Sequence, residues 1–203
     1  MTSSITYTNY LQEPVNKEEF DALDNKCIVY TETGLVKKIE RINHDCVYHI
    51  TYYLGGNETT NSVLAMFDGL DVDIVTRSVV DDYTLEESSG YNVARELTFL
   101  FKELYDTSGN LICSQDYDLA SKLPIAKSTD KYLFDNPDEM WVLWFNYNDD
   151  GSFKSICGNW VDNTDQGRKG SIYNDKLSLY FPTLLTDFPY YKNSDILPPP
   201  AGL

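Results

Sequence analysis

Residues 95–117, RELTFLFKELYDTSGNLICSQDY, contain the clearest indication of the fold class. In the first half of this stretch Leu97, Phe99 and Phe101 fall on one face, because successive side chains of a strand point to opposite sides. Residues 105–111 then supply polar turn residues and a glycine, the residue that best tolerates a positive φ angle. The stretch therefore predicts an antiparallel hairpin.

The same pattern recurs along the chain, and it indicates about ten strands joined by short turns. The further strands are expected at residues 45–54, 71–80, 141–147, 152–160, 167–173 and 176–181, with an additional turn at residues 32–34. No helix-length periodic segment separates successive strands, so a parallel sheet with crossover helices is not expected.

One helix start is well marked near the N-terminus. Asn16 is a good N-cap, and Glu19 stands at the position that completes a capping box. With 203 residues, the chain is expected to be a single domain. Its parts are a short helix at 16–25, an antiparallel β core at 26–181 and a proline-rich extended tail at 182–203.

The predicted fold class is all-β and mainly antiparallel. The strand count and the consecutive hairpins resemble those of lipocalin-like proteins, and the resemblance implies a calycin-like barrel of about eight to ten strands with a short N-terminal helix. A two-sheet β-sandwich and a flat sheet are the alternatives.

The charge of the chain excludes some partners. The formal net charge is −16, and nucleic acids and anionic membranes attract basic surfaces rather than acidic ones. The first ten residues have neither a basic residue nor an apolar run, so they do not resemble a secretion signal. No apolar run approaches the roughly 20 residues that cross a bilayer. We therefore expect a soluble, cytoplasmic protein.

The sequence contains no pattern typical of a metal site or a cofactor site. Its four cysteines are far apart and form no C-x-x-C pair, which predicts buried, reduced thiols. His44 and Cys46 would share a face of a strand and could both bind a metal ion. His49 would point to the opposite face, and the sequence offers no further ligands for the site. Nucleotide-binding loops and nucleophile elbows are also absent. We expect no cofactor, and whether the protein is an enzyme stays open.

The segment 140–147 is the most informative for a binding site. Its two faces are both apolar, with Trp141, Leu143, Phe145 and Tyr147 on one and Met140, Val142 and Trp144 on the other. Such a strand is either covered on both sides, or it faces a core on one side and a ligand or partner on the other.

Two charged residues also have positions that suggest a site. Arg95 and Glu103 are each an even number of positions from Leu97, so in an unbroken strand both side chains point to the same side as Leu97. Their charges would then lie at the two mouths of a barrel, unless the strand ends fray. The candidate ligand-binding residues are Arg95, Glu103, Trp144, Tyr48, Tyr52, Phe99 and Phe101.

Two functions follow from these patterns. The first is the binding of a small, largely apolar ligand in an aromatic-lined barrel or cleft, with cofactor-free lyase, isomerase or cyclase activity as a variant. The alternative is an acidic protein-binding module, an inhibitor or immunity-type partner of a basic protein. A structural or assembly component is a third hypothesis.

Overall fold

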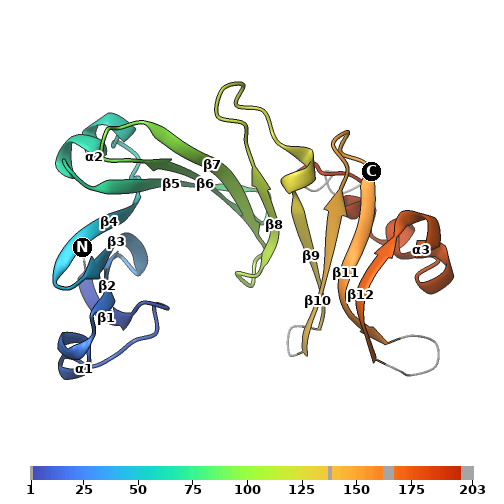
Figure 1. Cartoon of the computed structure of the whole chain (residues 1–203), viewed down its shortest axis with the longest axis horizontal. Coiled ribbons are helices and arrows are strands. Elements are labelled where there is room, and N and C mark those ends of the chain that lie inside the picture. The colour runs from blue at the N-terminus through green and yellow to red at the C-terminus, as the bar shows by residue number, and fades with distance from the viewer. Residues whose placement is uncertain (1, 137–138, 162–166, 198–203) are drawn as a thin grey trace. The chain divides into compact units, whose positions relative to one another are not determined.

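The computed structural model describes residues 2–136, 139–161 and 167–197, and its strands form one sheet of twelve that pair in chain order (Figure 1). The strands are β1 (Ser3–Asn9), β2 (Asn25–Glu32), β3 (Leu35–Asn43), β4 (Cys46–Tyr53), β5 (Asp71–Val80), β6 (Tyr83–Tyr91), β7 (Leu97–Tyr105), β8 (Leu111–Asp116), β9 (Asp130–Asn136), β10 (Glu139–Tyr147), β11 (Phe153–Val161) and β12 (Gly167–Tyr173). No helix in the described ranges is long and apolar enough to cross a membrane.

The sheet is mainly antiparallel and open. The hairpin of β7 and β8 is confirmed, and Gly109 in its turn has a φ angle of 82°. Strands β1 and β12 each have one neighbour, whereas a barrel closes only when its first and last strands pair. The calycin-like barrel is therefore not confirmed, and the flat-sheet alternative fits the observed strand order.

The chain divides into two compact units. The N-terminal unit comprises Met1–Ser78 and Glu86–Leu100, and the C-terminal unit comprises Val79–Leu85 and Phe101–Leu203. The expectation of a single domain over residues 1–203 stays a prediction.

The predicted N-terminal helix is present as α1 (Lys17–Ala22), but it ends before residue 25. The β core expected at 26–181 is also too short at its start, because β1 precedes the helix and β2 begins at Asn25. Asn16 accepts a hydrogen bond from the Glu19 amide, and the Glu19 carboxylate accepts one from the Asn16 amide, so the capping box is complete. Phe20 is buried against Tyr7 of β1, with 4.8 Å between the ring centroids. This aromatic contact packs the helix on the sheet.

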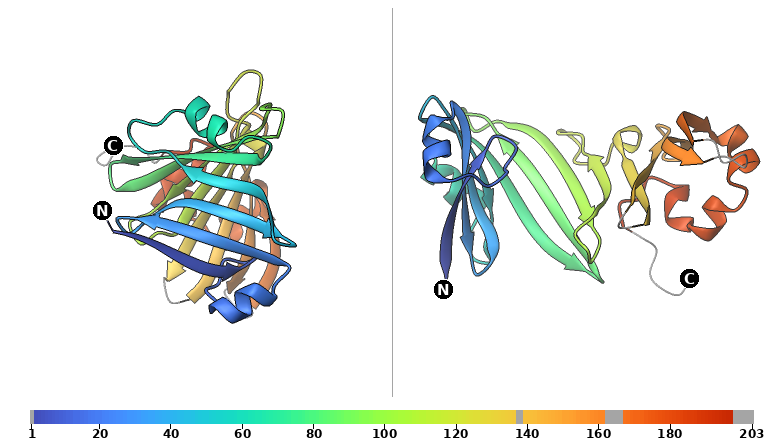
Figure 2. Two further views of the ribbon diagram at one scale, coloured as in Figure 1. Left: turned by 90° about the vertical axis from the view of Figure 1, so that its left-hand side faces the viewer. Right: turned by 90° about the horizontal axis from the view of Figure 1, so that it is seen from below.

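A second helix, α2 (Thr60–Met66), corrects the expectation that no crossover is present. It connects β4 to β5, which are parallel. The crossover was missed because seven residues are too few to show a helical period, although Thr59 and Ser62 form a capping box. Figure 2 shows α1 and α2 at opposite ends of the N-terminal unit.

The core of this unit lies between α2 and the central strands. Helix α2 contributes Val63 and Leu64, which pack on side chains of β4 and β5. The strand residues of this cluster are Ile50, Tyr52, Val72 and Ile74.

The C-terminal segment corrects two further expectations. Residues 176–181 do not form a strand. Residues 176–180 belong to α3 (Asn174–Tyr180), which lies beside β11 and β12, and Phe181 follows it (Figure 1). The tail expected to be extended contains α4 (Leu184–Asp187) and the 3₁₀ turn η2 (Pro189–Lys192). Leu177 of α3 and Leu184 of α4 are buried in one cluster with strand residues that include Phe145 and Ile156, and Leu185 is partly buried against the same cluster.

Candidate functional site

The structure places Arg95 away from the predicted strand face. Arg95 lies in the turn before β7 with a φ angle of 64°. The alternation of side chains along β7 therefore does not extend back to Arg95. Its guanidinium donates hydrogen bonds to the backbone oxygens of Phe67 (2.9 Å) and Leu70 (3.3 Å) and to Asp68 Oδ1 (3.2 Å). Arg95 therefore holds the loop that follows α2, and the inference that it shares a face with Leu97 is wrong.

The other predicted site residues belong to both units. Tyr48, Tyr52 and Phe99 are in the N-terminal unit, and Phe101, Glu103 and Trp144 are in the C-terminal unit. Tyr52 is buried under α2, whereas Tyr48 is exposed. Glu103 accepts a hydrogen bond from the Tyr105 hydroxyl at 2.9 Å. A role of these residues in ligand binding stays a prediction.

Phe99 has a specific packing role in the N-terminal unit. A methyl group built on Gly90 would lie 2.1 Å from Phe99 Cε1, so the Phe99 ring packs directly on the Gly90 backbone. The Thr98 hydroxyl also donates to the Gly90 oxygen at 3.1 Å. Phe99 therefore covers a gap that the glycine leaves between two strands.

The two sides of β10 differ in exposure where they are described. Phe145 is fully buried and stacks on Tyr191 with 4.2 Å between the ring centroids. Trp144 points to the other face and is 40% exposed. The side chains of Met140, Trp141 and Val142, on which the two-faced prediction also depended, lie outside the described residues.

The histidines do not form a metal centre in the described ranges. His44 and Asp45 have positive φ angles, 45° and 63°, so they form the turn between β3 and β4 rather than part of a strand. His49 contacts Asp73 instead, with 2.7 Å between Nε2 and Oδ2. Among the described residues, no group of three His, Cys, Asp or Glu side chains is suited to hold a metal ion.

The cysteines are only partly as expected. All four are free, and Cys27 and Cys113 are buried. Cys46 is exposed and Cys157 is only half-buried, so the expectation of a buried thiol is wrong at both. Cys46 is exposed because it begins β4 directly after the exposed turn.

A pocket of about 310 Å³ in the C-terminal unit is the best candidate site. Aromatic side chains dominate its walls, and we call it the tyrosine pocket. Its lining residues are Tyr83, Asp106, Ile112, Tyr132, Leu133, Phe134, Phe188, Tyr190 and Tyr191.

The tyrosine pocket lies where β8 and β9 separate. Only Cys113 with Lys131 and Ser114 with Asp130 are paired between these strands. At the next residue of β9, the Tyr191 hydroxyl donates to the Tyr132 backbone oxygen at 3.0 Å. A side chain from the C-terminal segment thus satisfies a backbone group that a continuous ladder would use.

The polar groups of the tyrosine pocket are few. The Tyr190 hydroxyl donates to the Ile196 oxygen at 2.7 Å, and the Asp106 carboxylate accepts from Ser108 and Asn110 within its own loop. In the part of the chain that the structure describes, the hydroxyls of Tyr83 and Tyr132 have no hydrogen-bond partner. Burial raises the pKa of Tyr132, so its hydroxyl stays protonated and is able to donate.

A buried lysine lies behind one wall of the tyrosine pocket. Lys131 is fully buried, and its Nζ donates to the Tyr190 oxygen at 2.7 Å and lies 3.6 Å from the centroid of the Tyr190 ring. Burial lowers the pKa of Lys131 to about 8, although Cys113 and Asp195 oppose this effect. Burial raises the pKa of the neighbouring Cys113 thiol to about 11.

Sequence reasoning missed most of this site. The prolines around Tyr190 and Tyr191 predict an extended outer tail, and no sequence pattern indicates a role for Lys131. The available signal was the pair of aromatic residues directly after Pro189, since such bulky side chains bury a large area when they pack.

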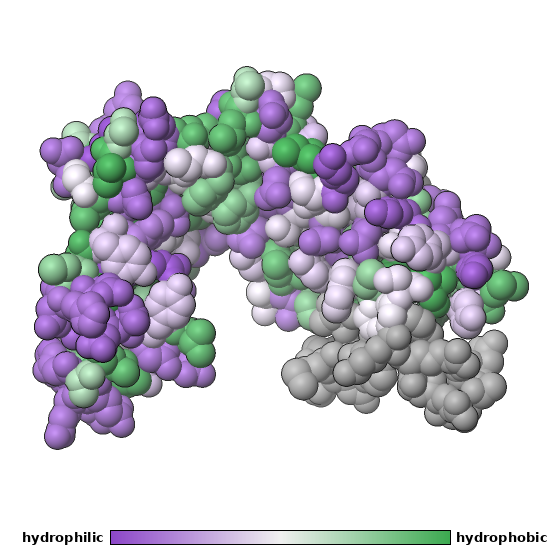
Figure 3. Space-filling model, in the orientation of Figure 1, coloured by the Kyte–Doolittle hydropathy of each residue, from purple (hydrophilic) through white to green (hydrophobic). Residues whose placement is uncertain are grey.

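Figure 3 shows polar residues over much of the molecular face in view, with apolar areas between them. Scattered apolar residues of this kind are normal for a protein surface.

Comparisons with known proteins provide no relative: no protein-family model, no curated protein and no solved structure matches the chain. The candidate site therefore depends on its geometry alone.

Proposed function

We propose that the C-terminal unit binds a small, largely apolar molecule in the tyrosine pocket. The observation that carries the proposal is a pocket with aromatic walls and two phenolic hydroxyls, those of Tyr83 and Tyr132, that lack partners among the described residues. Ligand sites typically combine apolar walls with a few polar groups that fix orientation. The volume of about 310 Å³ is suited to a compact ligand of one or two rings.

The ligand is expected to carry one hydroxyl or carbonyl group. Its rings bury apolar surface against Tyr190 and Phe188, and its polar group meets a tyrosine hydroxyl. Because the Asp106 carboxylate is already used within its loop, the pocket offers no free ionic partner among its described residues. A neutral ligand is therefore favoured over a charged one.

The test is a melting experiment with a library of small neutral aromatic molecules, with p-cresol, indole and 2-naphthol as first probes. A ligand that binds only the folded protein raises the melting midpoint. Tyr83→Phe and Tyr132→Phe remove one hydroxyl each, and we expect each to weaken binding of a hydroxyl-bearing ligand by about two- to tenfold. Tyr10→Phe, at an exposed tyrosine in the N-terminal unit, is the matched control and leaves binding unchanged.

Two results would contradict the proposal. One is that no library member raises the melting midpoint of the wild-type protein. The other is that Tyr10→Phe weakens binding as much as the two pocket variants, which would place the ligand outside the tyrosine pocket. The first result would favour the alternative function, an acidic surface that binds a basic protein, because the net charge of −16 suits such a partner.

A further inference from the structure

A second pocket, of about 260 Å³, lies within the N-terminal unit and is independent of the tyrosine pocket. It is formed by the turn between β2 and β3, the end of β4 and the second half of β5. We call it the Arg77 pocket. The residues that matter for its chemistry are Glu32, Leu35, Lys37, Tyr53, Leu54 and Arg77.

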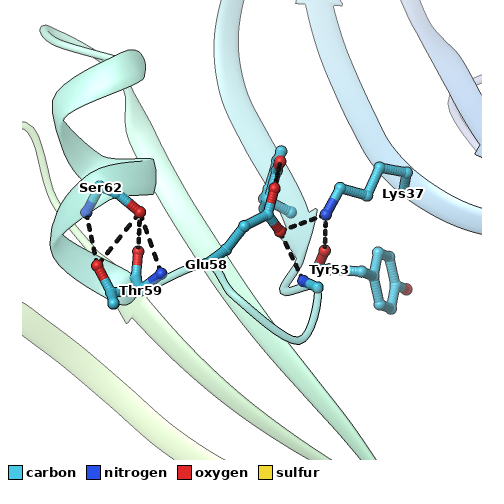
Figure 4. Close-up of polar contacts among 7 residues, drawn as sticks. Lys37, Tyr53, Glu58, Thr59 and Ser62 are labelled. Atoms are coloured by element: carbon cyan, nitrogen blue, oxygen red, sulfur yellow. Dashed lines mark hydrogen bonds and ion pairs between the residues drawn. The ribbon is translucent and has the colours of Figure 1, made fainter.

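A polar network borders the Arg77 pocket and includes its lining residues Lys37, Tyr53 and Gly55 (Figure 4). Lys37 Nζ donates to Glu58 Oε2 and to the Tyr53 backbone oxygen, the latter at 2.9 Å. Glu58 also accepts from the Tyr52 hydroxyl at 2.7 Å and from the Gly55 amide at 2.6 Å. The charge of Lys37 is thus neutralised within the protein.

The Glu58 carboxylate is held firmly in its ionised form. Burial alone would raise its pKa, but the hydrogen bonds from Lys37, Gly55 and Tyr52 outweigh that effect and lower it to about 2. Glu58 is therefore ionised at neutral pH, and its ion pair with Lys37 is present there.

Arg77 has unused donors in the same pocket. Its Nε donates to Glu86 Oε1, and its guanidinium carbon lies 4.1 Å from the centroid of the Tyr53 ring. These contacts fix the plane of the guanidinium. In the part of the chain that the structure describes, its Nη1 and Nη2 atoms have no acceptor, and such a fork matches a carboxylate in a two-point contact.

Glu32 supplies the opposite charge. It is exposed at the end of β2, and no hydrogen bond or ion pair of its carboxylate occurs within the described ranges. Leu35 and Leu54 add apolar surface to the same pocket. The pocket thus combines a cationic fork, a free carboxylate and an apolar area.

We propose that the Arg77 pocket binds a free α-amino acid with a small apolar side chain. The ligand carboxylate pairs with Nη1 and Nη2 of Arg77, its ammonium group pairs with Glu32, and its side chain packs on Leu35 and Leu54. A plain anion is disfavoured because the chain has a net charge of −16, which repels anions over long range. A zwitterion has no net charge and is not repelled.

The probe for this proposal is L-leucine, titrated into the full chain and followed by the amide NMR signals of Leu54 and Gly55. We expect saturable shifts at millimolar or lower concentration. N-acetyl-L-leucine lacks the ammonium group and isoamylamine lacks the carboxylate, so each is expected to bind at least about tenfold more weakly. Absence of binding by leucine, or equal binding of N-acetyl-L-leucine, would overturn the proposal.

Two variants test the assigned contacts. Arg77→Lys keeps the charge but loses the two-point fork, and we expect it to weaken leucine binding at least about tenfold. Glu32→Gln is expected to weaken binding of leucine but not of N-acetyl-L-leucine. Glu18→Gln, on α1, is the control and binds as the wild type does. Wild-type affinity of a folded Arg77→Lys protein would contradict the proposal, and circular dichroism establishes that it is folded.

Discussion

At the scale of single residues, Lys131 is a lysine whose side chain is fully buried in the C-terminal unit. Within the described ranges it forms no ion pair, so its charge is stabilised mainly by the Tyr190 oxygen and ring. Burying a charge without an opposite charge is unfavourable. We expect Lys131→Met to leave the free energy of unfolding at pH 7 unchanged or to raise it by up to about 3 kcal/mol, as measured by urea denaturation.

The same residue predicts a dependence of stability on pH. The folded-state pKa of Lys131 is about 8 against an ordinary value of 10.5, so above about pH 8 the unfolded chain binds more protons at this site. Its contribution to stability therefore rises from about pH 8 to about pH 10.5. Cys113 acts in the opposite direction above its ordinary value of 9.0 because its pKa is raised.

The free energy of unfolding of wild type and of Lys131→Met is measured at about pH 7 and about pH 9. The two proteins are compared at each pH because Cys113 is present in both. The wild type should gain stability relative to the variant as the pH increases. An unchanged difference would show that Lys131 is not buried in its charged form.

Phe145 and Trp144 provide a second comparison at this scale. Phe145 is fully buried and stacks on Tyr191, while its neighbour Trp144 is 40% exposed. Phe145→Ala should lower the free energy of unfolding by about 3–5 kcal/mol, and Trp144→Ala by no more than about 1 kcal/mol. Urea denaturation of both variants measures this, and equal large losses would mean that the Trp144 face is also part of a core.

At the scale of elements, the contact between Gly90 of β6 and Phe99 of β7 shows how one residue restricts another. Gly90→Ala places a methyl group where the Phe99 ring now lies. We expect it to lower the free energy of unfolding by about 1–3 kcal/mol, the usual cost of overpacking. In a Phe99→Ala background the same substitution should cost little, because the obstructing ring is gone.

A double-mutant cycle with urea denaturation measures this coupling. If the cost of Gly90→Ala is the same in both backgrounds, the ring does not restrict position 90. Gly56→Ala is the matched control, since no atom lies within 4 Å of a methyl group built there.

Elements also show which parts of the fold could be predicted from the sequence. Strands β4, β5, β7 and β10 were predicted because their apolar residues alternate over many positions, and α1 was predicted because its capping box is local. Helix α2 and the C-terminal helices were missed, since the helices are short and the burial of Leu184 and Tyr191 depends on contacts with strands far along the chain.

At the scale of the whole molecule, the sequence predicted the fold better than the site. Alternation gives the strands and their antiparallel turns, but it does not determine whether the last strand returns to the first. The expectation of an aromatic-lined site was made from residues of both units, whereas the tyrosine pocket is lined by Tyr132, Tyr190 and Tyr191 from one unit. Residues that meet in a pocket but come from distant segments do not follow a periodic pattern in the sequence.

The order of the strands has a consequence for how the protein reaches its native state. Strands that are neighbours in the sheet are also neighbours along the chain, so no strand pairing joins the two ends of the chain. Folding rates rise as the mean sequence separation of contacts falls, because short loops lose less entropy when they close. The growing sheet can therefore add strands one after another as the chain leaves the ribosome, before its last strand is made.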